Sequence, residues 1–251
     1  MTVVEMKEAR INVLENPKEL VHALAERFCA LAKEAIAQRN SFTCALSGGS
    51  TPQPLYELLA SPEYKGRVNW DKVLVFLGDE RCVPPDHPDS NFGMIKRLML
   101  AKISIPDHNI FAPEGQDKDP KASAQDYEEK VRRAFGHSEE VPRFDLNLLG
   151  LGPDGHTASL FPGTEALTVA DKLVVANFVP KFNSWRLTFT YKLINHSRHI
   201  DFMVDGQEKA SIVKEIFETK DKFPCQNVRP QGGTLEWYMD RAAASSLREV
   251  K

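Results

Sequence analysis

The sequence has few of the features that would place it in a specialised class of protein. Its cysteines are widely separated and form no C-x-x-C pair, which argues against a zinc framework and a disulfide scaffold; they are Cys29, Cys44, Cys82 and Cys225. Since Cys29 and Cys44 lie in apolar runs, we predict that both are buried free thiols. No apolar run approaches about 18 residues, so we expect no segment to span a membrane.

The chain also lacks an apolar stretch near its beginning and a strong charge of either sign. The first ten residues carry charges where a signal peptide would be apolar, and we therefore expect a cytoplasmic protein. The formal net charge is −3, whereas nucleic-acid binders normally show a basic face, so we expect no nucleic-acid partner. A small anionic substrate is compatible with this balance, because a few local cations can hold a phosphate group.

What remains is the composition of an ordinary globular protein, with 42% hydrophobic and 27% charged residues. The length of 251 residues is enough for one large α/β domain or two small ones. Because there is no internal repeat and no low-complexity tail, we predict a single domain over residues 1–251, acting as a monomer or a weak homo-oligomer.

Short apolar runs alternate with segments of helical spacing. The predicted strands are 42–46, 73–77, 144–149, 173–179, 186–191 and 199–205. The first predicted helix begins at Asn16-Pro17. The other predicted helices are 55–60, 122–135 (solvent-facing), 207–218 and 235–247, and residues 106–120 are predicted to form a surface connection. Near-continuous apolar strands between helices indicate an α/β fold with a largely parallel sheet covered on both faces.

Polar residues follow four of these strands, at the points where strands 42–46, 73–77, 144–149 and 199–205 end. In open α/β sheets, ligands bind just beyond the carboxyl ends of the strands. The sequence therefore predicts a ligand site at this edge of the sheet.

The first of these segments is the glycine turn Ser47-Gly48-Gly49-Ser50-Thr51-Pro52. Gly48 and Gly49 allow the backbone N–H groups to approach a ligand, while Ser50 and Thr51 add hydroxyl donors at a helix start. This pattern fits an anion cradle for phosphate, or a tight turn in which Ser or Thr caps the helix. It is no Walker A loop, since no Gly-Lys-Ser/Thr follows.

The segment Gly150-Leu-Gly-Pro-Asp-Gly-His-Thr157 matches G-x-G-x-x-G, the pattern of a dinucleotide-binding loop. The match is poor, because Pro162-Gly163 soon breaks any helix and no acidic residue ends a strand about 20 residues further on. His156 is the better chemical candidate, because a histidine can take a proton from water near neutral pH. Asp154 could fix its tautomer or bind a sugar hydroxyl. A structural histidine is the alternative, and Ser159 is interpreted as part of a turn.

Two further strand ends carry cations. In Gly78-Asp79-Glu80-Arg81, the guanidinium could hold phosphate or lactone oxygens and the two carboxylates could orient it, or the segment forms a salt-bridged turn. Lys209 opens a helix, where a cation is unfavourable unless an anion is also bound. Lys209 is thus either a phosphate ligand or a solvated lysine. No His/Cys cluster has metal-ligand spacing, so we expect no metal.

Several segments together resemble one known family. The stretch Leu149-Gly-Leu-Gly-Pro-Asp-Gly-His-Thr-Ala-Ser-Leu-Phe-Pro-Gly163 is similar to the signature of 6-phosphogluconolactonases, in the glucosamine-6-phosphate isomerase/6-phosphogluconolactonase family. Other blocks that resemble this family, in order along the chain, are 47–52, 78–81 with 89–91, 206–210 and 230–242. Pro153 departs from the pattern, at a position where a polar or small residue is more usual.

The resemblance implies hydrolysis of 6-phospho-D-glucono-1,5-lactone in the oxidative pentose phosphate pathway, without a cofactor. It also implies an architecture shared with glucosamine-6-phosphate deaminases and ribose-5-phosphate isomerases. In that family His156 would activate water, supported by Asp154 or Asp79. The phosphate grip would comprise Arg186, Lys209 and the turn from Gly48 to Thr51, with Asp79 and Arg81 lining the sugar end.

Two alternatives stay open at this stage. A glucosamine-6-phosphate deaminase or related isomerase resembles the chain at the glycine turn, but should carry a carboxylate soon after His156, where this chain has Thr157-Ala-Ser-Leu-Phe-Pro. A non-catalytic sugar-phosphate sensor would have no need of His156, and no helix-turn-helix segment accompanies the domain.

Overall fold

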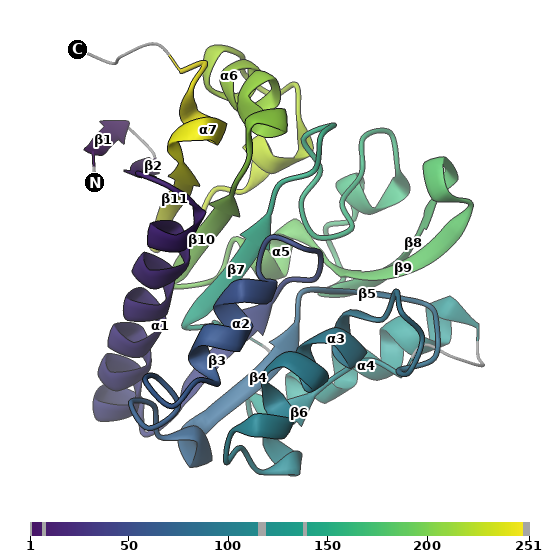
Figure 1. Cartoon of the computed structure of the whole chain (residues 1–251). Helices are drawn as coiled ribbons and strands as arrows, with labels where there is room; N and C mark the ends of the chain where they lie inside the picture. Colours follow the sequence, from purple (N-terminus) through teal and green to yellow (C-terminus); the bar gives the residue numbers. More distant parts are fainter. Residues whose placement is uncertain (1, 7–8, 115–118, 138–139, 248–251) are drawn as a thin grey trace.

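A computed structural model describes residues 2–6, 9–114, 119–137 and 140–247. Within these residues the main sheet has the order β1-β2-β11-β10-β7-β3-β4-β6 (Figure 1). The strands are β1 (Thr2–Met6), β2 (Ala9–Leu14), β3 (Phe42–Leu46), β4 (Val73–Leu77), β6 (Ile110–Phe111), β7 (Leu146–Gly150), β10 (His199–Val204) and β11 (Thr234–Asp240). All neighbours pair in parallel except β1 and β2, which confirms a largely parallel sheet.

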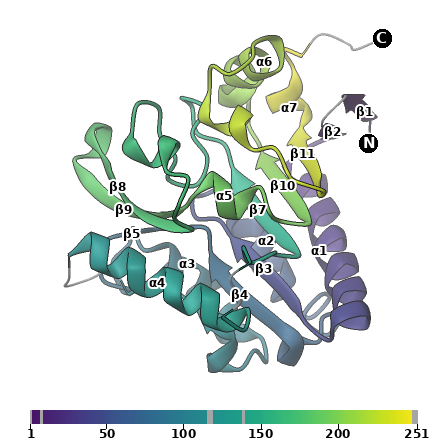
Figure 2. The ribbon, with the colours of Figure 1, turned by 180° about the vertical axis from the view of Figure 1, so that it is seen from behind.

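Helices cover both faces of this sheet, as predicted (Figures 1 and 2). One core is formed with α1 (Pro17–Arg39), α2 (Gln53–Leu59) and α3 (Asn91–Leu98), and the other with α4 (Pro120–Ala134), α5 (Tyr191–Ile194), α6 (Ala210–Glu218) and α7 (Arg241–Ala244). Successive strand residues point to opposite faces. In β4, for example, Val75 joins the first core and Phe76 the second, which explains why this strand has no polar face.

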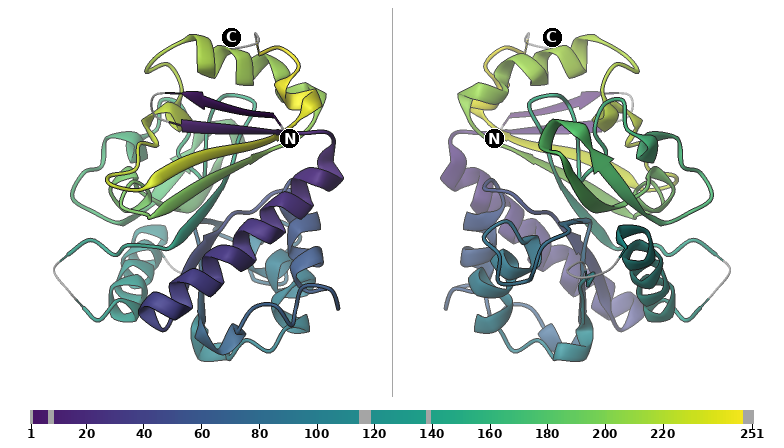
Figure 3. Two further views of the ribbon diagram at one scale, coloured as in Figure 1. Left: turned by 90° about the vertical axis from the view of Figure 1, so that its left-hand side faces the viewer. Right: turned by 90° about the vertical axis from the view of Figure 1, so that its right-hand side faces the viewer.

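Helix α1 runs obliquely across its face of the sheet (Figure 3). It begins as the sequence predicts, because the Asn16 side chain accepts a hydrogen bond of 3.0 Å from the Glu19 N–H. Cys29 in this helix and Cys44 in β3 are buried free thiols, also as predicted. None of the helices in the described ranges is long and apolar enough to cross a membrane.

The strand order reverses between β3 and β7. From β3 the chain builds outward through β4 and β6, and from β7 it builds outward in the other direction through β10 and β11. Such a topological switch point opens a crevice at the carboxyl ends of the two central strands, where ligands bind in α/β proteins. The glycine turn follows β3 and the histidine loop follows β7, so the switch point lies between them.

Two predicted strands form a separate sheet instead of joining the parallel one. β5 (Asp79–Arg81), β9 (Ser184–Phe189) and β8 (Val174–Val179) make an antiparallel sheet in that order. The connection between β8 and β9 is too short for the crossover that parallel pairing needs. It consists of a short 3₁₀ turn, Pro180–Phe182, and Asn183 in the left-handed region with φ of 46°.

The predicted C-terminal helix 235–247 is wrong over its first half, which forms β11. β11 is an interior strand, paired with β10 on one side and β2 on the other, and because side chains alternate along a strand, Trp237 and Tyr238 are buried on opposite faces. Asp240 then caps the short helix α7, accepting from the Ala243 N–H at 2.8 Å. Helix α4 is exposed on one face, as predicted for 122–135, and its other face is buried, where Tyr127 bonds to Leu77 of β4.

Candidate active site

The four strand-end segments picked out from the sequence converge at the switch point. Thr51 donates a hydrogen bond of 2.7 Å from Oγ1 to Asp205 Oδ1, which joins the end of β3 to the end of β10. Lys209 donates from Nζ to the Leu151 carbonyl at 2.9 Å, which joins the end of β10 to the loop after β7. Lys209 is the last residue of a 3₁₀ turn (Gln207–Lys209) and directly precedes α6.

The segment after β4 joins the same cluster through Asp79. Ser159 donates from Oγ to Asp79 Oδ2 at 2.7 Å, so this serine orients a carboxylate and is not arranged as a nucleophile. Asn91 donates to the Asp79 carbonyl at 3.0 Å from the other side. A Cβ on Gly48 would lie 1.9 Å from Asn91 Oδ1, so only glycine at 48 lets Asn91 reach this position.

The glycine turn differs in part from the two predicted forms. Gly49 adopts a φ of 90°, which requires glycine, and Ser50 is exposed. Neither Ser50 nor Thr51 caps α2; Pro52 stands at the N-cap position without a side-chain hydrogen bond, and the Thr51 hydroxyl is directed to Asp205. The turn therefore leaves Ser50 as the hydroxyl that is open to an incoming anion.

His156 is held at the centre of its loop by three contacts. Its carbonyl accepts from the Gly152 N–H at 2.8 Å, its Nδ1 bonds to Asp154 Oδ1, and its ring stacks on Phe161 with centroids 3.9 Å apart. An ionised carboxylate can only accept, so Nδ1 carries the proton and the opposite ring nitrogen, Nε2, has a free lone pair. The histidine side chain is 20% exposed. The arrangement presents a proton acceptor to the crevice.

The electrostatics keep this imidazole neutral near pH 7. Burial lowers the pKa of His156 below its ordinary value, although the nearby carboxylates of Asp154 and Asp79 act in the opposite direction. Burial would raise the pKa of Asp154, but hydrogen bonds from His156 and Lys181 together bring it down to about 2. Asp154 is thus an anion that stabilises the protonated ring once a proton has been taken. Asp154, and not Asp79, contacts the imidazole.

Two arginines lie side by side on the small sheet. Arg81 of β5 is directly opposite Arg186 of β9 in the strand register. Burial, together with the neighbouring Arg81, lowers the pKa of Arg186. Arg81 donates to the Asp89 carbonyl at 2.5 Å, while its buried Nε has no hydrogen-bond partner within the described ranges. Two adjacent guanidinium groups can bind an anion such as phosphate through charge-assisted hydrogen bonds.

Glu80 does not orient the Arg81 side chain as the sequence suggested. Its carboxylate accepts from the backbone N–H groups of Asn91 and Phe92, at 2.8 and 2.7 Å, and from the Ser90 hydroxyl at 3.2 Å. Burial raises the pKa of Glu80, and these hydrogen bonds oppose that effect. Glu80 therefore fixes the start of α3, and through it the position of Asn91.

Sequence reasoning missed Lys181, Phe161 and Asn91. Lys181 donates to Asp154 Oδ2 at 3.0 Å. Phe161 and Asn91 lie inside segments that resemble the family signature, so the signal was present but was not assigned a role. Lys181 carries no such signal, because it lies in a hairpin turn 27 residues from Asp154.

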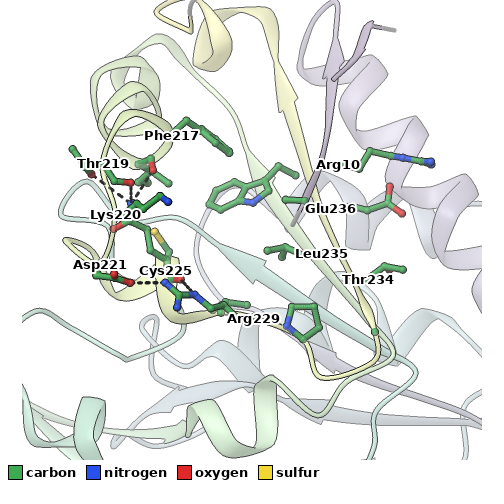
Figure 4. A pocket seen from close by; sticks show the side chains of 17 residues that line it. Arg10, Phe217, Thr219, Lys220, Asp221, Cys225, Arg229, Thr234, Leu235 and Glu236 are labelled. Atoms are coloured by element: carbon green, nitrogen blue, oxygen red, sulfur yellow. Dashed lines mark hydrogen bonds and ion pairs between the residues drawn. The ribbon is translucent and has the colours of Figure 1, made fainter. Parts of the chain in front are cut away.

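A cavity of about 1130 Å³ lies elsewhere, between the end of α6 and strands β2 and β11 (Figure 4). Its charged groups are held by protein partners: Arg229 pairs with Asp221, and Glu236 accepts from Arg27 at 2.7 Å. Its thiol is unreactive, since burial raises the pKa of Cys225 to about 12. With no histidine in its lining, this cavity lacks the proton acceptor that the switch-point site has. No group of three or more potential metal-ligating side chains occurs in the described part of the chain.

The fold and the site define an α/β protein whose switch point carries a histidine–carboxylate pair after β7 and cations after the neighbouring strands β4 and β10. The chain belongs to the family of glucosamine-6-phosphate isomerases and 6-phosphogluconolactonases, whose model matches residues 15–237. It is 42% identical over 246 residues to the 6-phosphogluconolactonase of Synechocystis sp., covering 95% of this chain and 98% of that protein. It is 36% identical to the 6-phosphogluconolactonase of Rattus norvegicus, covering 94% and 93%.

Solved structures agree with the predicted architecture. The 6-phosphogluconolactonase from Trypanosoma cruzi superimposes with a TM-score of 0.85 at 30% identity, covering 98% of this chain and 99% of that one. The enzyme from Thermotoga maritima gives 0.78 at 29%, covering 92% and 98%. A monomeric glucosamine-6-phosphate deaminase gives 0.79 at 20%, covering 94% and 99%, which confirms the shared fold.

Proposed function

We propose that the protein hydrolyses 6-phospho-D-glucono-1,5-lactone to 6-phosphogluconate, the second step of the oxidative pentose phosphate pathway, with His156 as general base. The observation that carries this proposal is the pair His156–Asp154 at the switch point, in which the hydrogen bond to Asp154 leaves Nε2 of His156 as a proton acceptor. The 6-phosphogluconolactonases named above support the choice of substrate.

In this reaction Nε2 of His156 takes a proton from water as the water oxygen attacks the lactone carbonyl carbon. The tetrahedral intermediate then collapses, the ring C–O bond breaks, and the leaving oxygen takes the proton back. Asp154 stabilises the imidazolium that exists between the two transfers. A δ-lactone is an activated ester, so one positioned base and a polarised carbonyl suffice.

The cations would hold the substrate in place for this attack. Arg186 and Lys209, with the turn from Gly48 to Thr51, would bind the phosphate group, and Asp79 and Arg81 would line the sugar end. The register of β5 and β9 supports a shared role for the two arginines, because an anion between them relieves the repulsion of adjacent like charges.

The test is proton release from freshly prepared 6-phosphogluconolactone, corrected for spontaneous hydrolysis. His156→Gln should lower kcat by about 10²–10⁴-fold, because it removes the general base. The variant should still bind 6-phosphogluconate in calorimetry, since no cation is lost. Full activity in His156→Gln would refute the assignment of the base. Ammonia release from glucosamine 6-phosphate, without lactone hydrolysis, would replace the proposed reaction with a deaminase.

A further inference from the structure

The tip of the β8–β9 hairpin lies against the histidine loop. Lys181 Nζ is 3.0 Å from Asp154 Oδ2, while the other oxygen of that carboxylate bonds to His156. The next residue, Phe182, packs edge-on against Phe161, with ring centroids 5.7 Å apart and an angle of 77°. Phe161 is the ring on which His156 stacks. The two residues of the tip thus contact the two groups that hold the imidazole.

The same tip also contacts the cationic side of the site. The guanidinium carbon of Arg186 lies 5.4 Å from the centroid of the Phe182 ring, within the range of a cation–π contact. Phe182 therefore stands between the arginine and the histidine loop. Phe182 is 49% exposed, so it makes these contacts at the surface of the molecule.

We propose that Lys181 and Phe182 are positioning residues of the active site, Lys181 by holding Asp154 against His156 and Phe182 by supporting both Phe161 and Arg186. This inference rests on the proposed function, in which His156 is the base and Arg186 binds the substrate phosphate. In this proposal the hairpin tip holds the His156 imidazole and the Arg186 guanidinium in fixed positions relative to each other.

The charges around His156 give the inference a pH signature. The groups that face the imidazole are Asp154 and Asp79, which favour its protonated form, and Lys181, which opposes it. Lys181 also draws the Asp154 carboxylate into an ion pair. Without Lys181, the full negative charge of Asp154 acts on His156, so the pKa of His156 should rise. As the pH is lowered, the active neutral form of His156 should then be protonated at a higher pH than in the parent.

The first experiment compares Lys181→Gln with Lys181→Arg and with Lys192→Gln as a matched control. Lys192 is also exposed, but within the described part of the chain its Nζ bonds only to a backbone carbonyl, that of Asp171 at 3.4 Å. Because Lys181 is half exposed, Lys181→Gln should lower kcat by about two- to fivefold with KM unchanged. The acid limb of kcat against pH should move up by about half a pH unit, Lys181→Arg should restore it, and Lys192→Gln should leave it in place.

The second experiment compares Phe182→Ala with Phe178→Ala. Phe178 is 39% exposed on the same hairpin, but its ring packs on Trp185 and contacts neither Phe161 nor Arg186 in the ring contacts of the described residues. Phe182→Ala should raise KM about two- to fivefold through Arg186 and lower kcat through Phe161. Phe178→Ala should change neither. Equal effects of the two variants would overturn the role of Phe182.

An NMR titration of the His156 imidazole separates the two proposals. If the parent protein does not hydrolyse the lactone, the proposed function fails, whatever the variants do. If it does, and Lys181→Gln leaves both the imidazole titration and the pH profile of the parent unchanged, the function stands and the role of Lys181 is refuted. An upward shift of the titration that Lys181→Arg reverses supports the inference.

Discussion

Gly152→Ala tests the position of the His156 ring without removing any functional group. A Cβ on residue 152 would lie 1.9 Å from His156 Nδ1 and 2.0 Å from Cε1. An ordinary contact begins near 3.4 Å, so the imidazole would have to retreat by about 1.5 Å. That displacement breaks the Nδ1–Asp154 hydrogen bond and the stacking on Phe161. The variant keeps every group that binds the substrate but moves the proposed base.

We expect Gly152→Ala to lower kcat about 10²-fold with little change in KM, because a misplacement of about 1 Å at a reacting group has a cost of that size. Crowding should also lower the free energy of unfolding by about 1–3 kcal/mol, so rates are measured well below the midpoint of thermal unfolding. Gly66→Ala is the matched control, since nothing lies within 4 Å of a Cβ there and its φ is not in the left-handed region. Parental kcat in Gly152→Ala would refute the view that the ring must occupy its present position.

Two further predictions concern the cations and a buried acid. Arg186→Ala or Lys209→Ala should mainly raise KM for the phosphorylated lactone, by the loss of about 1.5–3 kcal/mol; unchanged discrimination against an unphosphorylated lactone would refute the phosphate roles. Asp201 is fully buried, and burial raises its pKa from 3.8 to about 7, although Arg27 lowers it and Glu236 raises it further. Its protonation stabilises the fold below pH 3.8, and this contribution is lost as the pH rises to about 7. The free energy of unfolding of the parent, measured by urea titration, should therefore fall by up to about 4 kcal/mol over this range, and Asp201→Asn should remove that fall. An equal fall in the variant would contradict this prediction.

The sequence predicted best the strands whose bounds depend on their own local composition. Strands β3 and β4 were predicted with the bounds that the structure shows, because each is short and largely apolar and is followed within two residues by glycine. The location of the site followed from the polar residues after the strand ends, since parallel strands bring their carboxyl ends to one edge. Single-domain organisation, oligomeric state and the roles of the site residues stay predictions.

The misses involve partners that are far apart in the sequence. Trp237 and its neighbours form a strand because β2 and β10 lie on either side of them, and residues 235–247 alone do not show this. The contact of Lys181 with Asp154 likewise depends on how the hairpin of the small sheet is placed. Their spacing in the sequence was enough to predict that His156 and Asp154 act together. It could not predict Lys181, which reaches Asp154 from the hairpin of the small sheet.

The reversal of strand order between β3 and β7 has a consequence during synthesis of the chain. The two strands are held together by Asp145, which accepts from the Thr43 N–H at 2.8 Å across 102 residues of sequence. While the ribosome makes the intervening segment, the edge of β3 that will meet β7 has no partner. An apolar strand edge in that state can pair with another chain. The edge of β3 at the switch point is therefore open to pairing with another chain until β7 has been made.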